Sequence, residues 1–261
     1  MSNPFRACSR RRSLLNYLIF TLLLLTRLAQ ALAASPDSLF RDGVDFYHSG
    51  NYPKAVEAFS RAARLEPSSG TLQNLGLAEW QRGHAGEAIL AWEQALWFNP
   101  FDRAAHSNLD YVRRLAQIET PDLTWYEAVS AALPMNWWVW IAAISFWVAI
   151  AAVLLPGIFR RRRTGFYQAI AAIGLMIFLL TIIAQLGVQT RSRIGFVLAR
   201  DTLLRLTPTR EAQPIARLQP GEPVRLKKNR GKYVLVRTNR AIGWVLKDEV
   251  GSLCQKPILH S

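Results

Sequence analysis

Two long stretches without a charged residue, separated by four consecutive arginines, constrain this chain more than any other feature of its sequence. Residues 137–155 form the first stretch and residues 167–187 the second. A helix of nineteen residues is about 29 Å long, close to the ~30 Å hydrocarbon core of a bilayer. We therefore expect two transmembrane helices, and the alternative is a buried helical hairpin in a soluble protein. The intervening loop, 156–166, carries Arg160, Arg161, Arg162 and Arg163.

The charges that flank the first apolar stretch predict its direction across the membrane. Acidic residues Glu119, Asp122 and Glu127 precede it, and no lysine or arginine lies between Arg114 and residue 137. Loops rich in arginine stay in the cytoplasm, so the loop of four arginines is expected there. The regions on either side of the hairpin, residues 36–136 and 188–261, are therefore predicted to lie together outside the cytoplasm.

The first 34 residues have the pattern of a secretory signal peptide. Arginines precede an apolar run at residues 18–25, and Ala31 and Ala33 form a small-x-small cleavage pattern. Arg27 lies near the end of the apolar run. Because a charge there is unusual in a signal peptide, an uncleaved membrane anchor is the alternative.

The net charge of +14 is distributed over several separate regions. Residues 36–134 carry a net charge of −5, whereas residues 191–261 carry +10. No single basic face is expected along the chain, so nucleic acid is not expected as a partner. The two cysteines form neither a disulfide framework nor a metal-binding spacing.

Residues 36–118 contain a repeat with a period of 33 residues. Small residues at equivalent positions allow two helices to approach closely, the aromatic residues fill the space between hairpins, and proline ends a helix. The pattern predicts two helical hairpins stacked side by side. The repeated positions are Gly43, Ala55, Phe59, Ala62 and Pro67 in the first unit and Gly76, Ala88, Trp92, Ala95 and Pro100 in the second.

These positions resemble the tetratricopeptide (TPR) family, and residues 103–117 are expected to add a capping helix. The resemblance implies an α-solenoid that binds an extended peptide on its concave face. The side chains that it places there could instead be ordinary solvated polar groups. They are Arg41, Val44, Asn74, Leu77, Asn108 and Tyr111.

Residues 194–252 alternate short β-type runs with turn signals, which predicts a small all-β domain. The motifs Leu204-Arg205-x-x-Pro208 and Gly243-Trp244-Val245 resemble bacterial SH3 domains. The resemblance implies a small barrel that binds cell-wall peptides or other proteins, with Tyr233 and Trp244 as a candidate aromatic platform. The alternative is that Trp244 is a core residue.

The sequence contains no recognisable catalytic constellation. Its four histidines lack metal-binding spacing, and no nucleophile motif or phosphate-binding loop is present. We therefore expect a protein that is not an enzyme and that needs neither a cofactor nor a metal.

The order of segments resembles the BatE-like proteins of bacterial aerotolerance (Bat) operons. That resemblance implies a scaffold in the bacterial inner membrane, exposed to the periplasm, with von Willebrand factor A-type membrane proteins as partners in an envelope stress complex. The alternative function is peptidoglycan binding or sensing through the SH3-like domain.

The expected fold class is α+β, a multidomain membrane protein with an α-solenoid (TPR), two transmembrane helices and a small all-β SH3-like barrel. Its predicted segments are the signal peptide 1–34, the repeats with their capping helix 36–118, a linker 119–136, the spans 137–155 and 167–187 around the loop 156–166, the barrel 194–252 and a tail 253–261.

Overall fold

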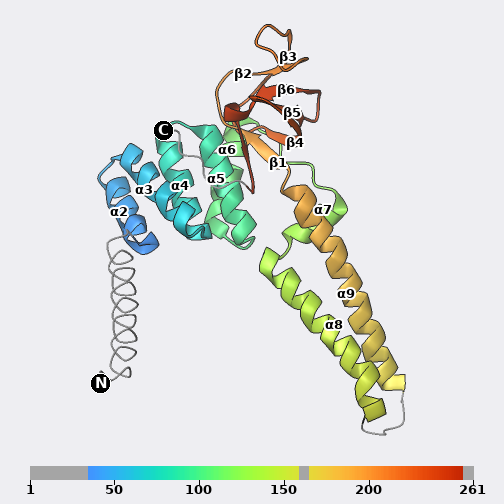
Figure 1. Cartoon of the computed structure of the whole chain (residues 1–261). Helices are drawn as coiled ribbons and strands as arrows, with labels where there is room; N and C mark the ends of the chain where they lie inside the picture. The colour runs from blue at the N-terminus through green and yellow to red at the C-terminus, as the bar shows by residue number, and fades with distance from the viewer. Residues whose placement is uncertain (1–34, 159–164, 255–261) are drawn as a thin grey trace, which may run out of the picture.

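The computed structural model describes residues 35–158 and 165–254 of the chain. Within these residues the fold is α+β, with eight α-helices and a seven-stranded antiparallel sheet (Figure 1). The predicted signal peptide with Ala31 and Ala33, and most of the tail, lie outside the described residues. The four arginines Arg160, Arg161, Arg162 and Arg163 lie outside them as well.

Five consecutive helices form an array in which each helix packs against the next one in the chain. Side chains at their N-termini explain where several of them begin, since Ser35, Asn51, Ser68 and Asp102 each accept a hydrogen bond from a backbone N–H of the first turn. The helices are α2 (Pro36–His48), α3 (Tyr52–Leu65), α4 (Ser69–Gln81), α5 (Ala85–Phe98) and α6 (Arg103–Ala116).

The repeated residues lie where the helices of each hairpin cross. A Cβ atom added to Gly43 would come within 2.6 Å of the Phe59 ring, and one added to Gly76 within 2.4 Å of the Trp92 ring. The aromatic and alanine positions of both repeats are buried, and Trp92 Nε1 donates a hydrogen bond to the carbonyl of Gln73 (3.1 Å). Pro67 and Pro100 lie just after α3 and α5. The 33-residue period therefore corresponds to one glycine–aromatic contact per hairpin.

The C-terminal region forms an open antiparallel sheet with the strand order β3-β2-β6-β5-β4-β1-β7. The sequence predicts a closed barrel, but β3 and β7 stand at opposite edges of this sheet and are not paired with each other. One reason is that β7 lies against α5, where Gln94 Nε2 donates to the carbonyl of Ser252 (3.1 Å). The strands are β1 (Ile194–Val197), β2 (Thr202–Arg205), β3 (Pro214–Leu218), β4 (Pro223–Arg230), β5 (Tyr233–Arg237), β6 (Ile242–Leu246) and β7 (Val250–Ser252).

The helical array and the sheet share one hydrophobic core. Ile194, Phe196 and Leu253 of the C-terminal region are buried in the same cluster as Ile89 and Trp92 of α5. A second cluster, built around Val234, Val236 and Val245, belongs to the sheet alone. The two regions are separated in sequence by the apolar hairpin, yet they pack together as one unit (Figure 1).

The two apolar stretches form the long helices α8 (Met135–Ile158) and α9 (Gly165–Arg191), which extend away from the rest of the fold (Figure 1). Both are long and apolar enough to cross a membrane, with spans at Asn136–Pro156 and Gly165–Arg191. They pack against each other, but only 6% and 17% of their most apolar windows are buried. That exposure disfavours a buried hairpin in a soluble core. A short helix, α7 (Trp125–Ala131), precedes α8 within the predicted linker and packs against α9.

Candidate functional site

The predicted linker, the sheet and the end of α9 meet at a buried ion pair. Glu127 of α7 has no exposed surface, and its carboxylate accepts two hydrogen bonds from Arg225 of β4. Arg225 Nη1 donates to Oε1 (2.8 Å) and Nη2 donates to Oε2 (2.7 Å). This two-pronged geometry is the strongest form of a carboxylate–guanidinium contact.

Further contacts tie this ion pair to the linker. The backbone N–H of Thr124 donates to Glu127 Oε2 (2.9 Å), which is one half of a capping box at the start of α7. Arg225 Nη2 also donates to the carbonyl oxygen of Asp122 (2.5 Å). Arg225 of the sheet therefore contacts both the linker, at Asp122, and the helix that follows it, at Glu127.

The same junction is attached to α9 and to α5. A Cβ atom added to Gly187 of α9 would lie 2.3 Å from the carbonyl oxygen of Tyr126, so α7 rests directly on the α9 backbone. The guanidinium of Arg191 stacks on the Trp97 ring of α5 at 4.7 Å, a cation–π contact. Together these contacts fix the orientation of the array and the sheet relative to the second apolar helix.

Burial by itself raises the pKa of Glu127, but the hydrogen bonds from Arg225 and the Thr124 backbone outweigh it. They lower the pKa from 4.5 to about 2. A carboxylate whose pKa is lower in the folded than in the unfolded protein stabilises the fold. This stabilisation is complete at pH values above the pKa of the unfolded state, and it is lost as the pH falls to the pKa of the folded state.

We expect Glu127→Gln to change the acid sensitivity of the fold. In the wild-type protein the free energy of unfolding should fall as the pH drops from about 4.5 toward about 2, and the variant should lack this component. The stability difference between the two proteins should narrow by about 2–3 kcal/mol over that range. Unfolding in detergent followed by tryptophan fluorescence at several pH values measures it. Parallel pH profiles for the two proteins would contradict the assignment.

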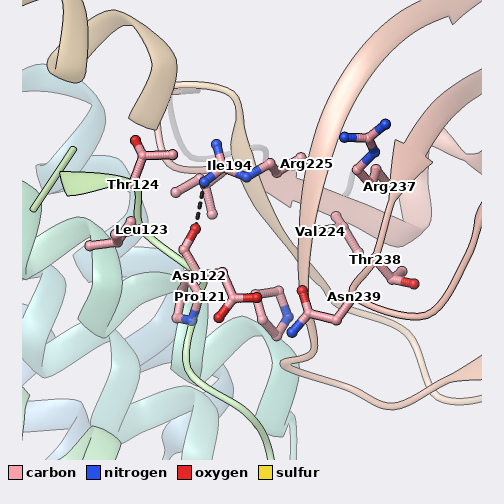
Figure 2. A pocket seen from close by; sticks show the side chains of 11 residues that line it. Pro121, Asp122, Leu123, Thr124, Ile194, Val224, Arg225, Arg237, Thr238 and Asn239 are labelled. Carbon is pink, nitrogen blue, oxygen red and sulfur yellow. Dashed lines mark hydrogen bonds between the residues drawn. The ribbon is translucent and has the colours of Figure 1, made fainter. Parts of the chain in front are cut away.

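A cavity of about 530 Å³ opens beside the ion pair. Figure 2 shows the linker residues on one side and the ends of β4 and β5 on the other, with the Arg225–Asp122 hydrogen bond between them. Asn239 Nδ2 donates to Glu119 Oε2 (2.9 Å) next to it, and Arg237 exposes its guanidinium. The lining residues are Pro121, Asp122, Leu123, Thr124, Ile194, Pro223, Val224, Arg225, Arg237, Thr238 and Asn239.

The polar side chains that line this cavity are Asp122, Thr124, Arg225, Arg237, Thr238 and Asn239. Arg225 is already paired with Glu127. The guanidinium of Arg237, which also lines the cavity, is the positive group that could bind an anionic group. The lining contains no histidine, cysteine or serine. Among the described residues, no group of three His, Cys, Asp or Glu side chains could hold a metal ion.

The six residues expected on a peptide-binding face lie at equivalent positions of α2, α4 and α6. Arg41 and Tyr111 are exposed, while Val44, Asn74, Leu77 and Asn108 are half-buried. Tyr111 meets Trp80 of α4 edge to face, with ring centroids 6.4 Å apart. Asn74 uses one N–H within its own helix, donating to the carbonyl of Gly70 (2.9 Å). We call these six residues the first-helix face.

Tyr233 and Trp244 lie on the face of the sheet opposite its core. In the β5–β6 register Leu235 pairs with Trp244 and Tyr233 pairs with Leu246, so these four half-buried side chains share one face. Valines at the alternate positions fill the core instead. Trp244 is therefore not a core residue. Basic residues border this face, since Arg205 pairs with Trp244 and Arg230 with Tyr233.

Sequence reasoning did not find the Glu127–Arg225 pair. The two residues are 98 positions apart, and each looks like an ordinary charge in a polar segment. The pattern Thr124-x-x-Glu127 is a capping signal that could have indicated the start of α7, but it carries no information about Arg225.

No protein-family model matches this chain, and no curated protein matches it either.

Proposed function

We propose that this chain is a non-enzymatic scaffold of the bacterial inner membrane that presents two interaction surfaces in the periplasm. The observation that carries the proposal is the shared core of the array and the sheet, attached through α7 and Arg191 to the last turns of α9. A binding surface held in this way has a fixed orientation relative to the membrane. Such an arrangement suits a protein that assembles other membrane proteins.

We assign the array to TPR-type hairpins with a capping helix and the sheet to the SH3-like class. The glycine–aromatic crossings of the two hairpins and the antiparallel strand order support these assignments. The segment order resembles BatE-like proteins of aerotolerance operons. The proposed partners are therefore von Willebrand factor A-type membrane proteins in an envelope stress complex.

The first-helix face is the proposed surface for a protein partner. The sheet packs against α5, which is the second helix of the second hairpin. The first-helix face lies on α2, α4 and α6, and α6 stays accessible. Tyr111 is 57% exposed and Leu115, one turn further along α6, is 62% exposed. An exposed aromatic next to asparagine side chains can bury apolar area and also bond a peptide backbone.

A photo-crosslinking amino acid placed at Tyr111 in cells tests this surface. We expect discrete adducts with specific membrane proteins, and we expect them to weaken when Asn74→Ala and Asn108→Ala are added. The control position is Glu57, an exposed residue of α3 outside the first-helix face. Identical adducts at Tyr111 and Glu57, or adducts unchanged by the asparagine substitutions, would remove this face from the proposal.

A second candidate function is cell-wall binding by the outer face of the sheet. It is favoured by the cluster of Tyr233, Leu235 and Trp244, bordered by Arg205 and Arg230. The whole protein should be retained on purified wall material at moderate salt, and Trp244→Ala should abolish retention. Retention that disappears with added salt and ignores Trp244→Ala would indicate charge alone. The full chain is needed because Ile194, Phe196 and Leu253 are buried against the helices.

A further inference from the structure

The direction of α5 places its C-terminal end next to the membrane helices. At its N-terminal end, Gly86 lies against the backbone of Leu198, just after β1. At its C-terminal end, Trp97 stacks on Arg191, the last residue of α9. Since β1 continues from α9, α5 runs antiparallel to β1 and points back toward the apolar hairpin.

Large apolar side chains are exposed at this end of the array. Phe98 ends α5 and is 43% exposed, and Phe101 in the following turn is 64% exposed. Leu65 ends α3, which is the equivalent helix of the first hairpin, and it is 59% exposed. Turns between helices are usually polar, so apolar residues in two equivalent turns indicate a surface that is covered. We call Leu65, Phe98 and Phe101 the apolar rim.

The height of the rim above the membrane can be judged from α9. With the sequence-based span 167–187 taken as the part of α9 inside the hydrocarbon core, that part ends at Gly187, which α7 covers, and Arg191 lies four residues further on. At 1.5 Å per residue that distance is about 6 Å. The headgroup layer on each side of a bilayer is about 5–7 Å thick. Trp97 contacts Arg191 at this level, so the residues beyond Trp97 lie within reach of the headgroups.

The surrounding residues are those found at membrane interfaces. Trp125 of α7 and Trp137 and Trp140 of α8 are exposed at the same end of the hairpin. Tryptophan is enriched at the level of the lipid headgroups. Near the rim, Arg103 is exposed and can pair with lipid phosphates. The aromatic residues at this end of the hairpin and the apolar rim are thus both of the kind that contacts lipid headgroups.

We propose that the apolar rim inserts into the headgroup layer of the same bilayer that α8 and α9 cross. This inference rests on the proposed membrane attachment and adds a second contact between the protein and the lipid. Because the array is attached rigidly to the end of α9, the contact limits the tilt of α9 in the bilayer. It also holds the first-helix face at a constant angle to the membrane plane.

Spin labels on the full-length protein in nanodiscs of phosphatidylglycerol and phosphatidylcholine test the proposal. Single cysteines at Phe101 and Leu65 are labelled in a background with Cys8→Ser and Cys254→Ser. Collisions with oxygen, which concentrates in lipid, are compared with collisions with a water-soluble nickel chelate. We expect oxygen collisions to dominate at Phe101 and Leu65.

Two further labels separate failure of the rim from failure of the membrane attachment. Gln81, exposed at the opposite end of the array, should show the reverse ratio with nickel dominating. Leu179, exposed in the middle of α9, should show strong oxygen collisions. If Leu179 reports lipid while Phe101 behaves like Gln81, the rim proposal is overturned and the span stands. If Leu179 also reports water, the membrane attachment and the rim proposal fail together.

Discussion

Gly86→Ala is expected to separate the sheet from the helical array and to lower the free energy of unfolding by about 2–3 kcal/mol. The added Cβ would lie 2.5 Å from the carbonyl oxygens of both Val197 and Leu198 and 2.7 Å from the Leu198 Cα. All three are backbone atoms, so no side-chain rotation can relieve the contact. The segment after β1 would have to move away from α5, which would open the shared core. Denaturant unfolding in detergent measures the loss of stability.

Gly70→Ala is the matched control for this substitution. Gly70 and Gly86 are each the second residue of their helix, α4 and α5, but nothing lies within 4 Å of a Cβ added at Gly70. Alanine is the better helix former, so Gly70→Ala should leave stability unchanged or raise it by up to about 1 kcal/mol. Equal effects of the two substitutions would mean that the contact between α5 and the sheet does not stabilise the protein.

Arg225→Ala is expected to destabilise the protein by about 2–3 kcal/mol. The substitution removes both hydrogen bonds to the Glu127 carboxylate and leaves a charge with no exposed surface. The effect should lie near the lower end of the range for buried ion pairs, because the Arg225 side chain is 33% exposed and water can partly replace it. Hydrogen exchange should increase in α7, because the linker and that helix lose their contact with the sheet. Thermal unfolding in detergent measures the overall loss.

Arg237→Ala tests whether this effect belongs to the ion pair rather than to the loss of an arginine. Arg237 lines the same cavity on the neighbouring strand, is exposed, and makes no ion pair among the described residues. Its substitution should change stability by less than about 0.5 kcal/mol. Adding Glu127→Gln to Arg225→Ala should restore part of the lost stability, because the unpaired charge is removed. Failure of this second substitution to help would show that Glu127 is solvated and not buried.

Much of the fold could be predicted from local and periodic patterns. Uncharged length predicts α8 and α9, and the 33-residue period predicts the two hairpins. The period did not predict that Phe59 and Trp92 pack on the glycine of their own hairpin, because the aromatic residues were expected between hairpins. Alternation and turn signals predict most strands of the sheet. The prediction of a closed barrel was wrong, because whether β3 and β7 pair depends on what else contacts the sheet edges. Here α5 occupies the edge at β7.

The candidate site could be predicted only in part. Asn108 and Tyr111 could be placed on one helix face because residues three apart on a helix are neighbours. Tyr233 and Trp244 could be placed on neighbouring strands, but which face of the sheet each occupies depends on the strand register. Glu127 and Arg225 could not be paired at all, since many charges of each sign are available in these polar segments.

The sequence by itself determined most of the elements of this protein: the helices of the array, most strands of the sheet, and the two helices that are apolar enough for a membrane. These properties depend on residues close together in the chain, where spacing and composition are sufficient. Only the tertiary structure decided that the array and the sheet form one unit attached to α9. That arrangement depends on contacts such as Gly86 with Leu198, Glu127 with Arg225 and Trp97 with Arg191. Each joins residues that are far apart in the chain, and their fit is set by the shapes of surfaces that exist only after the elements have formed.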